Sequence, residues 1–311
     1  MTDATAGPEG AASEGAPRWA EWRDVWPNAA ASRFVEAAGI TWHVQVAGQG
    51  PAVLLLHGTG GGTHSWERIL PRLAAHCTVV ACDLPGHAFT EAPAPERLTL
   101  PGMAADVARL LETLGVRPRL AAGHSAAGAI LLRMALDGTL PELRALVGIN
   151  AAIVPPPGLY RAFAGRWVRG LFTGPTAARL AARYAARAGV VEAMLRSSGS
   201  RVPPLLVRCY EGLATSERHD RSALTMMAQW ELEPTLREVH HLRTPTLLLA
   251  GTGDRWVPAA AARRVAAYIP GARVELWPGH GHLMHEEAGD ATAERLLRAA
   301  EESGALARAA A

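Results

Sequence analysis

Short apolar runs alternate with stretches of helical periodicity along most of the chain. Predominantly apolar runs predict buried strands at 53–56, 79–82, 119–122, 146–150, 246–250 and 274–277. A period-2 alternation of apolar and polar residues predicts a half-buried strand at 40–46. Helical spacing predicts helices over 101–114, 129–136 and 286–306. Because strands alternate with helices, we expect an α/β fold in which helices flank a mostly parallel central sheet.

The alternation of strands and helices stops between residues 150 and 247. Pro155-Pro156-Pro157 marks the break, and helical spacing then continues through 159–172, 176–188, 190–197, 205–213 and 218–230. This segment is too long for a loop and too helical for more sheet. We therefore expect a helical lid, residues 155–238, inserted into a core formed by residues 33–154 and 239–311.

The expected lid carries an unusual charge. The chain contains no lysine, and residues 159–230 hold eleven arginine residues against four acidic ones. Such a balance suits an anionic ligand or an acidic partner. Solvent-facing positions that fill with arginine in a lysine-free protein would give the same pattern, and the sequence favours neither explanation.

The first 32 residues differ from the rest of the chain. Residues 1–18 are mostly Ala, Gly, Glu, Ser and Pro, which predicts disorder. Trp19, Trp22 and Trp26 follow at spacings that place three indoles on one helical face. So short a helix is marginal by itself, so we expect it to dock on the main body. A partner-binding or interfacial helix is the alternative.

Composition and charge narrow the class of protein. Of 311 residues, 49% are hydrophobic and 19% charged, which is typical of a globular protein with a sizeable core. A formal net charge of +2 gives no argument for a nucleic-acid partner. No apolar run is long enough to span a bilayer, and the N-terminus lacks a secretion signal. The cysteines Cys77, Cys82 and Cys209 lack metal-binding spacing and predict buried thiols. We expect a cytoplasmic protein with no transmembrane segment and no cofactor.

Residues 123–128, with the sequence GHSAAG, lie between a predicted strand and a predicted helix. A serine at a sharp strand-to-helix turn is typical of a nucleophile elbow, in which a strained backbone lifts the hydroxyl clear of the sheet. Residues packed behind the serine must be small, and the flanking Gly and Ala residues satisfy this. Ala127 stands where the pattern G-x-S-x-G has its second glycine. Ser125 is the candidate nucleophile.

A serine hydroxyl is a poor nucleophile unless a base takes its proton and an acid orients that base. Asp254 follows the predicted strand 246–250, at the sheet edge where ligands bind in open α/β sheets. We predict Asp254 as the acid, and a capping role for the next helix is the alternative. His282 follows the last predicted strand in a Gly-containing loop, and we predict it as the base.

Two further histidines share the loop of His282. His280 precedes it by two residues, and His285 has the position of a first-turn helix residue. A metal site is the alternative for the three rings, but their spacing matches no recognised ligand pattern. We therefore predict no metal.

Two backbone N–H groups must stabilise the negative charge that develops on the substrate oxygen. The amide after the nucleophile is Ala126, and the second donor is expected in the glycine-rich loop after strand 53–56, at Thr59. Losing one such donor typically costs about 3 kcal/mol of transition-state stabilisation. We expect the substrate pocket to be lined by Gly58, His57, Trp66 and His124. His57 is more typical of a side chain that bridges loops than of a catalyst.

These motifs together resemble the α/β-hydrolase fold superfamily over about residues 33–300, and the resemblance is carried by His57-Gly58, Asp83-Leu84-Pro85-Gly86-His87, Gly123-His124-Ser125, Asp254 and Gly281-His282. It implies an α/β-hydrolase fold whose catalytic groups follow the chain order Ser, acid, His. A closer resemblance is to the magnesium-chelatase accessory proteins of bacteriochlorophyll biosynthesis, and the segments that carry it include Trp26-Pro27-Asn28, Trp42-His43-Val44-Gln45, Gly199-Ser200-Arg201 and Met226-Met227-Ala228-Gln229-Trp230. This resemblance implies a place at or near the insertion of Mg²⁺ into protoporphyrin IX.

Three functions stay open. The first is a serine hydrolase that acts on an ester or similar acyl bond of a small molecule. The family resemblance implies a tetrapyrrole or its precursor as ligand, whose propionate groups lid arginines could bind. The second is a non-catalytic accessory protein that binds porphyrin or the magnesium chelatase subunits. The third is a general esterase or a cofactor-free peroxidase, which uses a similar triad. Fold alone does not choose among them.

Overall fold

The computed structural model describes residues 17–154 and 175–307, and its centre is an eight-stranded sheet with the order β1-β2-β4-β3-β5-β6-β7-β8. The strands are β1 (Ser32–Ala37), β2 (Ile40–Ala47), β3 (Ala52–Leu56), β4 (Thr78–Cys82), β5 (Pro118–His124), β6 (Ala145–Ile149), β7 (Thr246–Gly251) and β8 (Arg273–Trp277). β2 pairs antiparallel with β1 and with β4, and all other neighbours in the sheet are parallel. This mostly parallel sheet confirms the predicted fold class.

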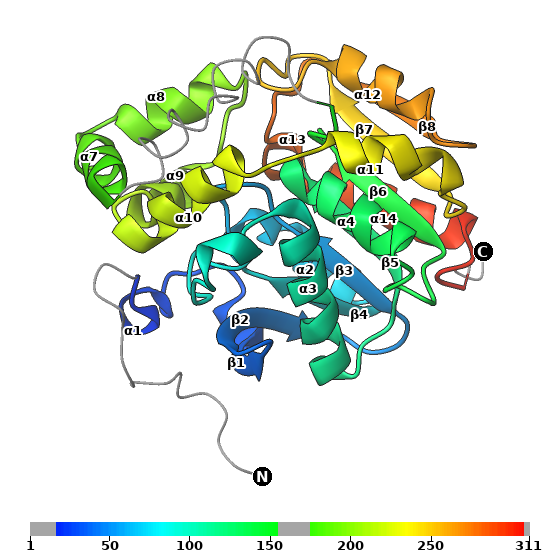
Figure 1. Cartoon of the computed structure of the whole chain (residues 1–311), viewed down its shortest axis with the longest axis horizontal. Coiled ribbons are helices and arrows are strands. Elements are labelled where there is room, and N and C mark those ends of the chain that lie inside the picture. The colour runs from blue at the N-terminus through cyan, green and yellow to red at the C-terminus, as the bar shows by residue number, and fades with distance from the viewer. Residues whose placement is uncertain (1–16, 155–174, 308–311) are drawn as a thin grey trace.

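Alternate residues of the central strands enter two different apolar clusters, one on each face of the sheet. Leu54 and Leu56 of β3 pack with α3 (Leu100–Leu114), α4 (Ala126–Leu136) and α12 (Ala259–Ala266). Val53 and Leu55 pack on the opposite face with α2 (Ile69–Ala74) and α14 (Gly289–Glu302). Figure 1 shows α3 and α4 in front of the strands. The sheet is thus buried on both sides, which explains why its strands read as continuous apolar runs.

Every strand expected from the sequence is present. β1 was missed because its sequence, SRFVEA, has neither a continuous apolar run nor a period-2 alternation. The predicted helix over 286–306 is wrong in detail. The chain forms a short helix α13 (Met284–Glu287), leaves helical geometry at Ala288 (φ −126°, ψ 48°), and then continues as α14. The three cysteines are buried free thiols, as expected. In the part of the chain described here, no helix has the length and apolar character needed to cross a membrane.

Helices, and no strand in the described residues, lie between β6 and β7. They are α7 (Pro175–Ala185), α8 (Val190–Ser197), α9 (Pro204–Leu213), α10 (Glu217–Ala228), α11 (Glu233–Glu238) and a short 3-10 turn, Val239–His241. Helices α7 to α10 gather on the left in Figure 1, beyond one end of the sheet. The expected helix over 159–172 lies outside the described residues.

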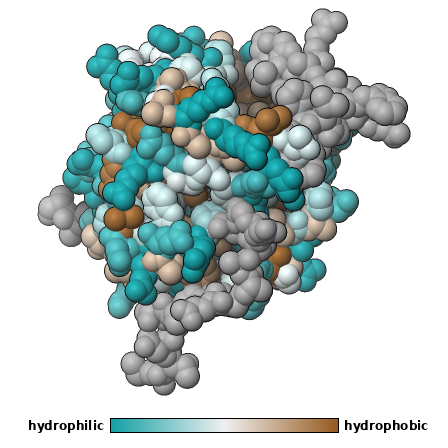
Figure 2. Space-filling model, turned by 90° about the vertical axis from the view of Figure 1, so that its left-hand side faces the viewer, coloured by the Kyte–Doolittle hydropathy of each residue, from teal (hydrophilic) through white to brown (hydrophobic). Residues whose placement is uncertain are grey.

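The arginines of these helices do not all contribute free charge. Arg179 and Arg196 form ion pairs with Glu217 and Glu192. The Arg218 guanidinium is largely buried and donates to the carbonyls of Ala88 and Thr90, so it joins α10 to the core. In Figure 2, which faces the side with α7 to α10, hydrophilic side chains predominate and hydrophobic ones form small separate patches.

The N-terminal indoles pack between the core and α9. Helix α1 covers only Trp19–Trp22, and Trp26 follows in a turn, so the expected single helix through all three indoles is wrong. The three rings join a cluster with Phe34, Phe89, Cys209 and Leu213. The Trp26 indole N–H also donates to the Thr63 hydroxyl at 3.0 Å. The segment therefore contacts the core and the helices between β6 and β7 at the same time.

Gly212 is the point at which α9 meets Trp22. A Cβ at this position would lie 1.9 Å from the Trp22 ring. We expect Gly212→Ala to lower the free energy of unfolding by about 1–3 kcal/mol through overpacking. In a Trp22→Ala background the same change should raise it by about 0.5–1 kcal/mol, because alanine is the better helix former. Urea unfolding of the four proteins measures both effects, and the same sign in both backgrounds would contradict the contact.

Candidate active site

Ser125 occupies the sharp turn between β5 and α4. Its backbone is left-handed (φ 52°, ψ −118°), a conformation that costs a residue with a side chain about 1–3 kcal/mol. Neighbouring backbone holds it there: the Ser125 N–H donates to the Ile149 carbonyl at 3.0 Å, and the Ser125 carbonyl accepts from Gly128 and Ala152 at 3.1 and 2.9 Å. The predicted elbow is therefore present in the geometry that exposes a side chain at the end of the sheet.

The residues around the elbow show why it tolerates Ala127. Ala127 is fully buried in the main core, so its methyl group fills space there. The two glycines have no such room. A Cβ on Gly123 would lie 2.8 Å from the Ala127 carbonyl group, and one on Gly128 would lie 2.5 Å from the Ala151 Cβ. The tight position that follows the serine is thus Gly128, one residue later than in the G-x-S-x-G pattern.

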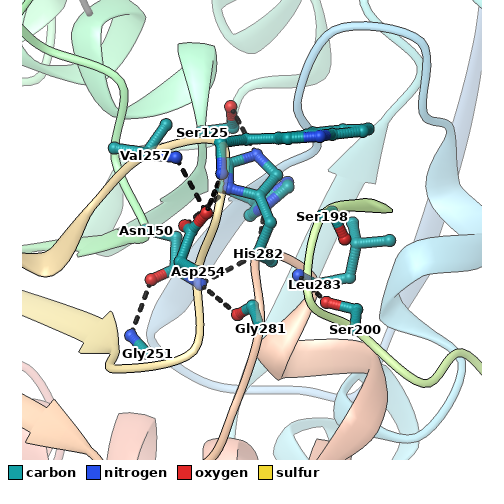
Figure 3. Close-up of polar contacts among 12 residues, drawn as sticks. Ser125, Asn150, Ser198, Ser200, Gly251, Asp254, Val257, Gly281, His282 and Leu283 are labelled. Carbon is teal, nitrogen blue, oxygen red and sulfur yellow. Dashed lines mark hydrogen bonds and ion pairs between the residues drawn. The ribbon is translucent and has the colours of Figure 1, made fainter. Parts of the chain in front are cut away.

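The structure brings together the three side chains predicted as a triad (Figure 3). His282 Nε2 lies 3.1 Å from Ser125 Oγ, and His282 Nδ1 lies 2.7 Å from Asp254 Oδ2. The other Asp254 oxygen accepts the N–H groups of Trp256 and Val257, both at 2.8 Å. Because an ionised carboxylate only accepts, Nδ1 carries a proton and Nε2 is left to accept the serine proton.

Asn150 connects the ends of β6 and β7 to the loop of His282 (Figure 3). Its side-chain NH₂ donates to the carbonyls of Gly281 and His282, at 2.9 and 2.8 Å, and its oxygen accepts the Gly251 N–H at 2.8 Å. The residue is almost fully buried and left-handed (φ 44°). The sequence placed this residue only at the end of the predicted strand 146–150, and its role in holding the histidine loop was missed.

A second brace on His282 comes from the segment after α8. The His282 N–H donates to the Ser198 carbonyl at 3.3 Å, and the Leu283 N–H donates to the Ser200 hydroxyl at 2.8 Å. The contact is close, since a Cβ on Gly281 would lie 2.4 Å from the Ser200 hydroxyl. The helices between β6 and β7 therefore help to place the imidazole.

His57 fixes the peptide that leads to Thr59. Its Nδ1 donates to the Gly58 carbonyl at 2.7 Å, and its Nε2 accepts the Leu84 N–H at 2.8 Å, so both ring nitrogens are occupied by backbone. Burial lowers the pKa of His57, which keeps the ring neutral. In a trans peptide the N–H points opposite to the carbonyl, so the Thr59 N–H points away from the His57 ring.

Asp83 holds the far end of the same loop. Its carboxylate accepts the N–H groups of Thr63 and Phe89, at 2.6 and 3.1 Å, and lies 2.7 Å from His43 Nδ1. Burial alone would raise the pKa of Asp83, but His43, the nearby His57 and the Thr63 N–H lower it to about 2. The loop from Gly58 to Thr63 is therefore tied down at both ends.

Ser125 opens into a cavity of about 1190 Å³. Its walls come from α7, α8, α10 and the loop after β7, and they also include Gly58, Thr59, His124, Ala126 and His282. Gly58 and His124 thus line the cavity as predicted. The prediction is wrong for His57 and Trp66, which do not line it. Both are fully buried, His57 by its backbone contacts and Trp66 by packing in the core against α2 and the His285 ring.

A buried polar group behind the triad was not predicted from the sequence. The Tyr210 hydroxyl on α9 donates to Glu286 Oε1 on α13 at 2.7 Å, and both side chains are buried. Burial raises the pKa of Glu286 to about 7 and lowers the pKa of the adjacent His285 to about 3. Among the residues that the structure describes, no group of three or more His, Cys, Asp or Glu side chains is placed to hold a metal ion.

The α/β hydrolase fold family matches residues 51–289 of the chain, which is well over half of its length. The chain belongs to the α/β-hydrolase fold family. The fold agrees with a solved structure of a putative lipase from Acinetobacter baumannii AYE, with a TM-score of 0.76 and 19% identity over 94% of this chain and 99% of that one.

Two sequence relatives extend this comparison within the α/β-hydrolases. The Magnesium-chelatase 30 kDa subunit of Rhodobacter capsulatus is 36% identical over 274 residues, 88% of this chain and 95% of the relative. The match confirms the closer resemblance noted in the sequence. A pimeloyl-[acyl-carrier protein] methyl ester esterase of Xanthomonas axonopodis pv. citri is 29% identical over 273 residues, 82% of this chain and 97% of the relative.

Replacing Asn150 tests whether it holds the histidine loop. We expect Asn150→Ala to lower the free energy of unfolding by about 3 kcal/mol, because two carbonyls and one N–H become unpaired in a buried place. Asn28 is a matched control, since it is also left-handed (φ 56°) but only partly buried. Asn28→Ala should cost about 1 kcal/mol. If urea unfolding shows that both variants lose the same free energy of unfolding, the role of Asn150 is contradicted.

Glu286 gives the stability a dependence on pH. Its pKa in the folded protein is about 7 and its ordinary value is 4.5, so folding favours the neutral carboxyl. The stability that this group contributes is complete below about pH 4.5 and is lost as the pH rises through 7, by as much as about 3 kcal/mol. Glu286→Gln should therefore lose less stability than the wild type between pH 4.5 and 8. Glu294→Gln, an exposed control on α14, should follow the wild type.

Proposed function

We propose that the chain is a serine hydrolase that cleaves an ester or similar acyl bond in bacteriochlorophyll biosynthesis, at or near the magnesium chelatase step. The observation that carries the chemistry is the unbroken hydrogen-bonded series from Asp254 through His282 to Ser125, which opens into a large cavity. The pathway is inferred from the similarity to the Rhodobacter capsulatus chelatase subunit.

The geometry supports a two-step acyl transfer. His282 Nε2 takes the proton of Ser125 as its oxygen attacks the acyl carbon, and Asp254 stabilises the imidazolium that forms. Thr59 and Ala126 both line the cavity beside Ser125, which supports their N–H groups as the donors to the oxyanion. The Ala126 N–H begins α4 and has no partner within the helix, so it is available as a donor. His282 then protonates the leaving group, and a water molecule that it activates releases the acyl product.

The size and lining of the cavity favour a large apolar substrate. Its volume of about 1190 Å³ exceeds that of most small-molecule sites, and side chains such as Val191, Leu195, Leu224 and Met227 form much of the wall. A tetrapyrrole or a precursor of one, carrying an ester group, is compatible with this size and polarity. The substrate class is part of the proposal and follows from the chelatase similarity together with the cavity.

A second candidate is a non-catalytic accessory role, which the word subunit in the name of the Rhodobacter capsulatus relative favours. In that case the cavity would hold a porphyrin, or the surface would bind chelatase subunits, and Ser125 would be dispensable. Complementation of a strain that lacks the chain separates the two. The hydrolase proposal requires that Ser125→Ala fails to restore bacteriochlorophyll, and the accessory role requires that it succeeds.

Covalent labelling and ester hydrolysis test the proposed chemistry directly. We expect a fluorophosphonate probe to label the wild type at Ser125, and Ser125→Ala to abolish labelling. Asp254→Asn should keep its oxygen on Trp256 and Val257 and turn its NH₂ toward His282, which forces the wrong tautomer. We expect kcat on 4-nitrophenyl butyrate to fall about 10⁴-fold. Ser303→Ala and Asp137→Asn, both remote from the cavity, should match the wild type. An unlabelled wild type would contradict the proposal.

A further inference from the structure

One face of α10 forms part of the cavity wall. Residues 220, 223, 224 and 227 line it, at spacings of three and four that place them on the same side of the helix. Three of these side chains are apolar, namely Ala223, Leu224 and Met227. The fourth is Asp220, so a carboxylate faces a wall that is otherwise built for an apolar ligand.

Within the described residues, the charge of Asp220 has no partner. In the ranges 17–154 and 175–307, no hydrogen bond or ion pair involves its carboxylate, although the side chain is partly buried. Burial raises the pKa of Asp220 to about 7, and no neighbouring charge opposes this. A carboxylate that is withdrawn from water without a partner is unfavourable for the free protein. A ligand that supplies the missing partner would recover that cost on binding.

The position of Asp220 on α10 does not by itself explain the residue. An acid in the first turn of a helix stabilises the helix dipole, but Glu217 already does so from the surface, where it pairs with Arg179. The Ser216 side chain accepts the His219 N–H and caps the same helix end. The helix end is thus stabilised by two residues, Ser216 and Glu217, that are not among those lining the cavity.

We propose that Asp220 binds a nitrogen-bearing group of the ligand, an N–H donor or a protonated amine, deep in the same cavity as Ser125. Above its pKa of about 7 the carboxyl group of Asp220 is ionised and only accepts hydrogen bonds, so in that range it selects donors and rejects carboxylates and carbonyls. Charge-assisted bonds to N–H groups are the strongest that it can form, and apolar surroundings strengthen them further. The aromatic ring of Trp256 in the same wall adds a surface that favours a cation.

Two other charged side chains line the described part of the wall, and neither takes over this role. Glu231 has an interaction partner of its own. Arg255 lies in the loop after β7, is exposed, and suits an anionic group instead. The cavity therefore offers a ligand one accepting and one donating charge on different elements. As a statement about the substrate, the proposal rests on the proposed hydrolase function, but the binding of nitrogen compounds can be measured without hydrolysis.

The test compares two fluorescent probes of nearly equal size. Dansylcadaverine ends in a primary ammonium, and dansyl pentylamide ends in a methyl group. Binding of each is titrated by fluorescence at pH 8.5, where Asp220 is ionised and the amine is protonated. We expect the wild type to prefer the amine, and Asp220→Asn to weaken amine binding about tenfold or more while pentylamide binding changes less than about twofold. Asp220→Glu should restore part of the preference, and Glu217→Gln on the same helix should leave it intact.

Three results would overturn the proposal. One is an unchanged preference for the amine in Asp220→Asn. Another is that Asp220→Asn weakens the binding of both probes equally, which would mean that Asp220 only stabilises the cavity wall. The third is a wild type that binds the amine no better than the pentylamide. None of these depends on ester hydrolysis, and they leave the role of Ser125 to its own test. Thermal unfolding of each variant checks that the wall is still folded.

Discussion

The side chain of one asparagine joins the three pieces of chain that must meet for this site to exist. Asn150 directly follows β6, accepts from Gly251 at the end of β7, and donates to the carbonyls of Gly281 and His282. A carboxylate could not replace it, since two of its three bonds are donated. Parallel strands bring their carboxyl ends to one edge, but they do not fix the loops that follow. Asn150 supplies that constraint, so the distances among Ser125, Asp254 and His282 depend on it.

The sequence predicted the sheet well because buried parallel strands are continuous apolar runs, and few other structures share that pattern. It predicted that Ser125, Asp254 and His282 lie together because each of them follows such a run at the same edge of the sheet. The sequence did not predict the side chains that hold distant segments of the chain together through hydrogen bonds. The hydrogen bonds of Asn150 and the Tyr210–Glu286 contact join segments far apart in sequence, so no local sequence pattern predicts them. His57 and Trp66 were placed at the cavity by their nearness to the glycine loop, whereas the fold turns both inward.

The helices between β6 and β7 do more than cover the site, because they form part of its wall and are joined to the core. They supply the wall that carries Asp220, and Arg218 joins α10 to the core. Tyr210 on α9 contacts the buried Glu286 just after the histidine loop. Trp22 and Trp26 fill the remaining contact between α9 and the core. Several arginines of these helices thus have structural roles. The total charge of the helices is therefore weak evidence for an anionic ligand or an acidic partner.

The bonds from Ser198 and Ser200 to the backbone of residues 282 and 283 have a pharmacological consequence. The end of α8 is both a cavity wall and a support for the imidazole. A compound that bound beneath α8 and displaced this helix outward would move the His282 imidazole away from the Ser125 hydroxyl. On the proposed hydrolase function, such a compound would inhibit catalysis without contacting Ser125, and it would need neither a reactive group nor a mimic of the acyl group.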